Sequence, residues 1–362
     1  MGMSKMRRIL STASLIALGA GAATAGGLER SPQSVSVLFE DGNYVEFSLG
    51  AAAPDVSGTV AGGALSSGDM APGYGTVALA YKQALREDLD LAIILDQPIG
   101  ANVAYSASNA PYPFSGATAD VDSMAITALL RYRLPSNISI IGGLRAQSVK
   151  GTVAIPTIGN YSMTADTDRR LGYVVGMAWE KPEIAARVAL TYNSAITHTL
   201  TAHESFSPVP TSFDTEIPQS VNLEFQTGVA ANTLVFGSVR WVDWSKFDIT
   251  PPAFFAATGS SLASLESDYV SYTLGVGRKF NENWSGAVIL GYEGSSGLPQ
   301  GNLGPTDGYT SIGLAATYTM DNVRITGGVR YVDIGDATTK AIGANFADNS
   351  AVAAGLRVGF NF

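Results

Sequence analysis

The end of the chain alternates between apolar side chains and small or polar ones. The apolar positions of residues 352–362 are Val352, Ala354, Leu356, Val358, Phe360 and Phe362. The positions between them are Ala353, Gly355, Arg357, Gly359 and Asn361. A period of two is that of a β-strand with one apolar face. A closing aromatic residue is typical of the last strand of an outer-membrane barrel, because such barrels carry an aromatic girdle at each membrane edge.

The same period recurs along the chain and predicts an all-β fold. Segments with this period cover 43–57, 72–84, 88–100, 123–134, 137–150, 168–179, 183–198, 217–229, 233–247, 268–280, 283–294, 308–319, 322–333 and 350–362. Most of them reach the roughly 9–11 residues that a tilted strand needs to cross a membrane. An even number of strands is expected of a single-chain bacterial barrel. We therefore expect a transmembrane antiparallel β-barrel of 14 strands.

The connections alternate between tight turns and long loops. Turn-forming residues make up 84–88, 134–137, 180–182, 230–232, 281–283 and 320–322. The intervening connections are 58–71, 101–122, 151–167, 199–216, 248–267, 295–307 and 334–349. This alternation predicts periplasmic turns at one end of the barrel and extracellular loops at the other.

The N-terminus has the layout of a secretory signal peptide. Lys5, Arg7 and Arg8 precede an apolar run, and small residues at 23 and 25 suit cleavage before Gly26. We expect a signal peptide at 1–25, a short segment at 26–42 and the barrel at 43–362. The protein is then expected in the outer membrane of a Gram-negative cell, in contact with its lipids.

Composition excludes several other functions. The formal net charge is −9, which disfavours nucleic acid as a partner. The chain lacks cysteine, so it has no disulfide framework and no thiolate metal site. The only histidines are His198 and His203, and no nucleophile lies in a recognisable pattern with a base. We expect no catalytic residues, no metal and no cofactor, and hence a protein that is not an enzyme.

Parity places several arginines inside the barrel. The candidates for contact with a ligand carboxylate are Arg145, Arg187, Arg240 and Arg330. Guanidinium groups bind carboxylates in a bidentate way and keep their charge in a dry environment. The alternative is that these arginines form structural ion pairs with lumenal acids such as Glu46, Asp90, Glu224 and Glu293.

Three predicted extracellular loops are unusually apolar. They contain Tyr112, Phe114, Phe206, Phe213, Phe254, Phe255, Leu262 and Leu265. Clustered apolar side chains on loops mark a binding surface or pack against one another. A landing site for a hydrophobic ligand and a loop core folded over the barrel mouth both remain open.

Two short motifs, Trp241–Phe247 and Ser31–Gln33, resemble motifs of the FadL/TodX family. The run from Trp241 to Phe247 is similar to the Trp-x-x-Trp-Ser-x-Phe pattern of that family. Ser31-Pro32-Gln33 looks like its Asn-Pro-Ala motif, although Ser31 and Gln33 replace the first and last residues. The family's N-terminal hatch spans several dozen residues, so residues 26–42 would be a shortened hatch.

The resemblance implies passive transport of long-chain fatty acids or other hydrophobic small molecules by a monomeric barrel. It also implies a lateral opening beside a kinked third strand, which here is the segment 88–100 with Pro98. The short hatch leaves a general diffusion porin with an open lumen as the alternative. A surface adhesin that uses the loops 101–122 and 248–267 is a third possibility.

Overall fold

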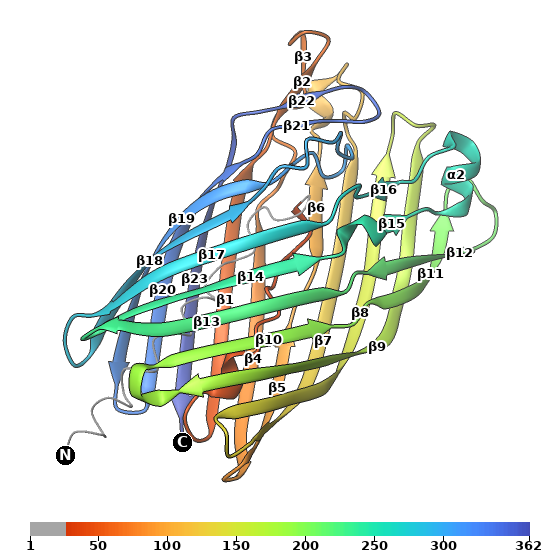
Figure 1. Ribbon diagram of the computed structural model, residues 1–362. Helices are drawn as coiled ribbons and strands as arrows, with labels where there is room; N and C mark the ends of the chain where they lie inside the picture. Colours follow the sequence, from red (N-terminus) through yellow and green to blue (C-terminus); the bar gives the residue numbers. More distant parts are fainter. Residues whose placement is uncertain (1–26) are drawn as a thin grey trace.

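The computed structural model describes residues 27–362, and the predicted signal peptide lies outside this part of the chain. The described residues form a closed antiparallel barrel of 14 wall strands, as the sequence predicts (Figure 1). β1 pairs with β4 on one side and with β23 on the other, which closes the wall. No helix among the described residues is long and apolar enough to cross a membrane.

Three of the wall strands are interrupted and carry two labels each. The wall consists of β1 (Tyr44–Asp55), β4 (Tyr74–Arg86), β5 (Leu89–Asp96) with β6 (Gly100–Ala104), β7 (Thr118–Arg133), β8 (Ile138–Ile155), β9 (Tyr161–Lys181), β10 (Ala186–Asn193) with β11 (Ile196–Glu204), β12 (Thr211–Ile217) with β13 (Ser220–Ala230), β14 (Thr233–Val242), β17 (Tyr269–Lys279), β18 (Trp284–Glu293), β19 (Tyr309–Met320), β20 (Val323–Ile334) and β23 (Asn349–Asn361).

Small elements lie outside the wall strands, and most of them belong to the loops that are expected to be extracellular. β2 (Gly58–Val60), β3 (Leu65–Ser66), β21 (Ala337–Thr338) and β22 (Asn345–Phe346) form a four-stranded sheet. β15 (Asp248–Ile249) pairs with β16 (Ala263–Ser264), and α2 (Pro252–Thr258) lies between them. The 3₁₀ turns are η3 (Ser36–Phe39), η4 (Ala107–Asn109), η5 (Pro182–Ile184) and η6 (Trp244–Lys246).

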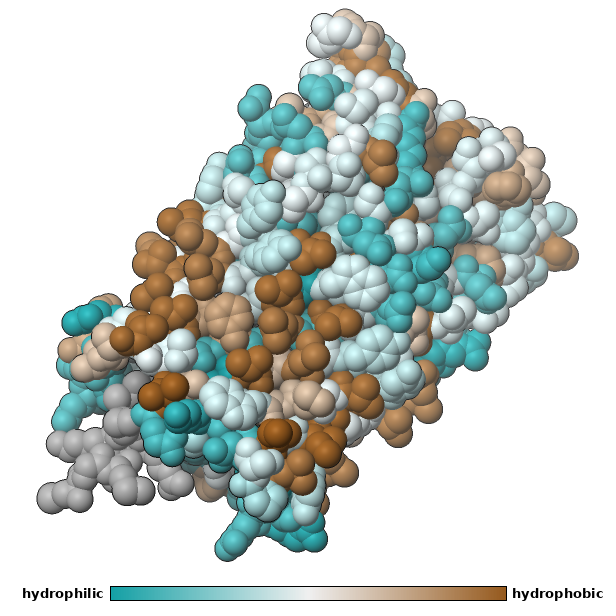
Figure 2. Space-filling model, viewed as in Figure 1, coloured by the Kyte–Doolittle hydropathy of each residue, from teal (hydrophilic) through white to brown (hydrophobic). Residues whose placement is uncertain are grey.

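In the part of the wall that faces lipid, side chains alternate along each strand, and the apolar ones point outward. Ile140, Leu144 and Leu171 are 53%, 63% and 72% exposed, although all three are apolar. On the face that Figure 2 shows, hydrophobic residues gather in a band across the wall, and hydrophilic residues are more frequent towards both ends. Aromatic pairs flank the band, among them Tyr173 with Tyr192 and Trp284 with Tyr318. This is the surface expected of a membrane-spanning barrel.

Three of the expected loops are too long, because the strands continue past the membrane. The expected loop 101–122 shrinks to 105–117 between β6 and β7. β8 runs to Ile155 and β9 starts at Tyr161, so the expected loop 151–167 shrinks to 156–160. The expected loop 199–216 likewise shrinks to 205–210 between β11 and β12. Beyond the hydrophobic band the side chains still alternate, but the outward-facing ones are polar and the inward-facing ones are apolar. On β11, Thr197, Thr199 and Thr201 point outward, whereas Ile196, Leu200 and Ala202 are buried.

Within residues 27–362, the backbone ladder of the wall is interrupted between β4 and β6 and again along β9. Between β5 and β6 the chain passes through Gln97, Pro98 and Ile99, and the β4–β5 pairing ends at Leu79 and Leu95. Within residues 27–362, no pairing joins β4 to β6, and the side chain of Gln97 accepts a hydrogen bond of 3.1 Å from the Val77 N–H. Proline lacks an N–H, so it cannot continue a ladder.

The second discontinuity lies along β9, between the part of β9 that pairs with β10 and the part that pairs with β11. Pairing stops at Val174 with Asn193 and resumes at Ala165 with Ala202. The stretch 166–173 therefore faces 194–201 without a regular ladder. A side-chain contact crosses this gap, in which Nδ1 of His198 lies 3.0 Å from a carboxylate oxygen of Asp168.

Candidate functional site in the barrel lumen

The described N-terminal segment, residues 27–43, lies inside the barrel. The Gly100 N–H donates to the carbonyl of Leu28 at 2.8 Å, and the Arg30 N–H donates to the carbonyl of Pro98 at 3.0 Å. The hydroxyl of Ser31 donates to the carboxylate of Asp96 at 2.5 Å. Further along, the amide of Asn222 on β13 donates to the carbonyl of Pro32. The segment is thus bound to opposite sides of the wall.

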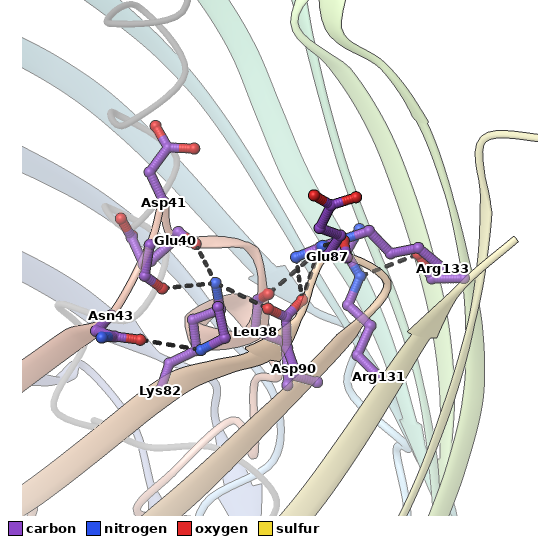
Figure 3. Close-up of polar contacts among 12 residues, drawn as sticks. Leu38, Glu40, Asp41, Asn43, Lys82, Glu87, Asp90, Arg131 and Arg133 are labelled. Carbon is purple, nitrogen blue, oxygen red and sulfur yellow. Dashed lines mark hydrogen bonds and ion pairs between the residues drawn. The ribbon is translucent and has the colours of Figure 1, made fainter. Parts of the chain in front are cut away.

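A buried polar network anchors this segment at the end of the barrel that is expected to be periplasmic (Figure 3). The ammonium of Lys82 donates to the carbonyls of Glu40 and Gly42 at 2.9 and 2.8 Å, and it lies 3.1 Å from Asp90. The side chain of Asp90 is fully buried and also pairs with Arg131 and Arg133. One carboxylate therefore serves three cations at the base of the lumen.

The network also takes in the 3₁₀ turn η3. The guanidinium of Arg131 donates to the carbonyl of Leu38 at 3.2 Å, and Arg324 pairs with Glu40 at 3.2 Å. The ring of Phe39 lies 4.3 Å from the guanidinium of Arg131 and 4.3 Å from that of Arg187. Cation–π contacts of this kind stabilise a desolvated arginine. The apolar residues Val37 and Leu38 are buried on the same turn.

The four arginines proposed to meet a ligand carboxylate lie at different places in the lumen. Arg240 pairs with Glu29 and donates to Asn222 at 2.6 Å. Arg145 interacts electrostatically with Asp96 and donates to Thr127 at 3.0 Å. Arg187 stacks on Phe39, whereas Arg330 forms no ion pair with any residue in 27–362. The first three have the contacts of a structural network, and a role of any of the four in ligand binding stays a prediction.

An apolar cavity occupies the lumen above the membrane band. Its volume is about 90 Å³, within a hollow of about 950 Å³ that includes open space. Its apolar lining includes Leu28, Ile99, Val121, Val149, Val153, Met163, Leu200, Phe213, Ile217, Phe247, Ile249, Leu262, Leu265 and Leu303. Of the loop residues predicted to bind a hydrophobic ligand, Phe213, Leu262 and Leu265 meet at this cavity.

The other predicted loop residues lie elsewhere. Tyr112 and Phe114 pack on the ring of Tyr105, with ring centroids 5.7 and 5.9 Å apart. Phe206 and Phe254 pack on Tyr161, at 5.0 and 4.8 Å. Phe255 is 49% exposed on α2. Their contacts are those of a loop core, and their role in binding a ligand is a prediction that these contacts leave open.

Glu204 holds this loop core together. Its carboxylate accepts hydrogen bonds from the backbone N–H groups of Ala253 and Phe254 at 3.1 and 2.8 Å, and from Tyr161 at 3.1 Å. Burial acts to raise the pKa of Glu204, but these bonds and one from Thr211 outweigh it and hold the pKa below its usual value. A carboxylate thus fixes the start of α2 beside the barrel mouth.

Sequence reasoning missed most of the cavity lining, because many of these residues lie in segments that were expected to be loops. Val153, Met163 and Leu200 are examples, and they belong to wall strands instead. The missed signal was the exchange of faces, since Val149 and Val153 continue the inward parity of Arg145 and Gln147 on β8. A second cavity, of about 100 Å³ and more polar, lies beside the break in the third strand. Arg30, Asp96 and Gln97 line it together with Val77 and Leu79 of β4. Within residues 27–362, no group of three or more His, Asp or Glu side chains could hold a metal ion.

The fold and the lumen together define a class: an outer-membrane β-barrel whose lumen holds its own N-terminal segment. No protein-family model matches the sequence, and no curated protein matches it either. Solved structures do match. The fold is similar to that of a Pseudomonas aeruginosa FadL homologue, with a TM-score of 0.76 and 13% identity, over 95% of this chain and 96% of that one.

Two further structures share the fold. The Pseudomonas putida toluene transporter TodX matches with a TM-score of 0.65 and 12% identity, over 96% of this chain and 99% of its own. The Ralstonia pickettii toluene transporter TbuX matches with a TM-score of 0.62 and 13% identity, over 97% of each chain. The resemblance that the Trp241–Phe247 run suggested is therefore confirmed as a likeness of fold over nearly the whole chain.

Replacing Asp90 tests the network at the base of the lumen. In the variant D90N the buried Lys82 and Arg131 and the partly exposed Arg133 lose their shared anion. We expect a loss of about 3–5 kcal/mol in the free energy of unfolding. Urea unfolding of the purified protein in lipid vesicles, followed by tryptophan fluorescence, measures this loss. The matched control is D88N, whose exposed pair with Arg86 contributes less than about 1 kcal/mol. Equal losses in both variants would contradict the network.

Proposed function

We propose that this protein is a passive channel through which hydrophobic small molecules, long-chain fatty acids among them, cross the outer membrane. The observation that carries the proposal is the apolar cavity in the upper lumen, because it offers a dry surface at the point where a molecule enters from the loops. A water-filled pore would need a polar lining at this position. The matching structures include toluene transporters and a FadL homologue, which supports a hydrophobic substrate.

The N-terminal segment argues against the general diffusion porin. Residues 28–31 contact the third wall strand, Pro32 contacts β13, and Glu40 pairs with Arg324 of β20. A segment bound to several strands narrows the aqueous path that a sugar would need. The short hatch is therefore consistent with a plugged lumen.

The break in the third wall strand offers a way out into the lipid. Val77 and Leu79 line the polar cavity behind the break and are also 49% and 43% exposed on the outer face. Here the hydrogen bond from the Val77 N–H to the Gln97 side chain takes the place of a backbone hydrogen bond between the two strands. A side-chain rotation opens such a contact more readily than a strand separates, because one bond breaks instead of a row of them. We propose that molecules leave the lumen sideways at this point.

One prediction of the proposed function concerns the entry of the hydrophobic molecule into the apolar cavity. The variant L265S places a hydroxyl in the apolar cavity, where Leu265 is 7% exposed, and we expect it to slow uptake of labelled oleate about tenfold. The assay uses cells that lack their own fatty-acid transporter but display this chain. The control V209S changes a loop residue that is 63% exposed and should leave uptake unchanged.

A sugar-permeation assay on the same cells separates the two functions. Oleate uptake without sugar leakage supports the hydrophobic channel. Sugar leakage without oleate uptake would instead establish a diffusion porin.

The second prediction concerns exit. Because the chain contains no cysteine, the double variant V77C/Q97C introduces the only two thiols. Bridging them with a short bis-thiol reagent should reduce oleate uptake to the level of cells without the protein, and reduction of a cleavable bridge should restore it. The single variants V77C and Q97C, treated in the same way, are the controls. Undiminished uptake with the bridge formed would place the exit elsewhere.

A further inference from the structure

Thr215 lines the apolar cavity and is one of three buried residues on neighbouring strands with a polar atom that lacks a protein partner among the described residues. The hydroxyl of Thr215, Nε2 of His198 and Nε2 of Gln147 have no hydrogen-bond partner among residues 27–362. The three residues are 4%, 0% and 2% exposed. A buried polar group left without a partner costs about 1–3 kcal/mol, so three such groups call for a physical explanation.

The topology places these groups on one side of the cavity. Thr215 lines the cavity directly, and His198 is its register partner across β11 and β12. Residues directly opposite each other in antiparallel strands project from the same face of the sheet. Gln147 lies on β8, one inward position from Val149, which also lines the cavity. The apolar pocket thus has a polar edge.

The contacts of His198 decide what this edge can bind. Nδ1 of His198 donates to Asp168, and Arg170 donates to the same carboxylate at 2.9 Å. β11 lies beyond the lipid-facing band, and burial together with Arg170 lowers the pKa of His198, although Asp168 acts to raise it. The imidazole is then neutral at pH 7, with its proton on Nδ1, so that Nε2 is a hydrogen-bond acceptor.

The charged residues that line the cavity already have partners. Asp120 accepts a hydrogen bond of 2.7 Å from Asn102, and Lys150 lies 3.4 Å from Asp122. Lys150 is moreover largely exposed to solvent. The polar edge therefore offers an imidazole acceptor, an amide donor and a hydroxyl, which suit a neutral group better than an ionised one.

We propose that the cavity binds a hydrophobic molecule with one uncharged hydrogen-bonding group, of which a long-chain alcohol is the simplest case. The alcohol O–H donates to Nε2 of His198, and its oxygen accepts from Thr215 or Gln147. The apolar chain lies against residues such as Leu200, Phe213 and Leu265. This inference rests on the proposed function and specifies its substrate class.

The test compares 1-dodecanol, dodecane and dodecanoate, each labelled, in cells that display the full chain and lack other channels for hydrophobic compounds. We expect dodecanol to enter faster than the other two. The variant T215V preserves shape but removes the hydroxyl, and it should lower the ratio of dodecanol uptake to dodecane uptake about threefold to tenfold. The variant T215S keeps the hydroxyl and should retain the wild-type rate.

Controls distinguish a failure of this inference from a failure of the proposed channel function. The variant T199V changes an outward-facing threonine of β11 and should behave as wild type. Each variant is first shown to be folded by its heat-modifiable migration on a gel. If T215V leaves the ratio of dodecanol uptake to dodecane uptake unchanged, or if dodecanoate is preferred, the polar edge is not the binding site although the channel stands. If none of the three compounds enters faster than in cells without the protein, the proposed function fails as well.

Discussion

The structure depends on one constraint: in lipid, every backbone N–H and C=O group must find its partner within the wall. Closure of β1 onto β23 satisfies this for the edges of the sheet. The constraint also limits where the wall can be incomplete. Both discontinuities described above carry polar side chains, Gln97 at one and His198 with Asp168 at the other. Side-chain groups there contact across the gap where the ladder fails.

A second consequence is that the two faces of the wall exchange roles along its height. In the membrane band the outer face is apolar because it meets lipid, and the inner face is polar. Above the band the outer face meets water, as Thr197 and Thr199 show, and Leu200 and Val153 turn an apolar surface inward. The apolar cavity arises from this exchange. A molecule that dissolves poorly in water thus meets a hydrophobic surface before it reaches the charged base of the lumen.

Much of this could be predicted from the sequence. The period of two and the spacing of turns predict the barrel because lipid allows few alternatives, and Met124 to Tyr132 show the expected outward parity. The upper wall was harder to predict. Its strands have polar outer faces, so a search for outward-facing apolar positions assigns them to loops. Parity suggested lumenal acids as partners for arginines, and Asp90 does pair with Arg131 and Arg133, but the partner of each individual arginine could not be predicted. Whether Arg240 meets Glu29 or a ligand depends on how residues 27–43 lie in the lumen, and no local pattern specifies that path.

The position of the N-terminal segment also bears on how the molecule is assembled. The segment leads directly into β1, and β1 must pair with β23, whose register joins Tyr44 to Asn361 near the two ends of the described chain. Glu40 contacts Arg324, so a partner of the segment belongs to one of the last strands to be synthesised. The segment must therefore already lie on the inner side of the sheet when the first and last strands meet. Contacts so distant in sequence are slow to form, and barrel closure and filling of the lumen become a single late event.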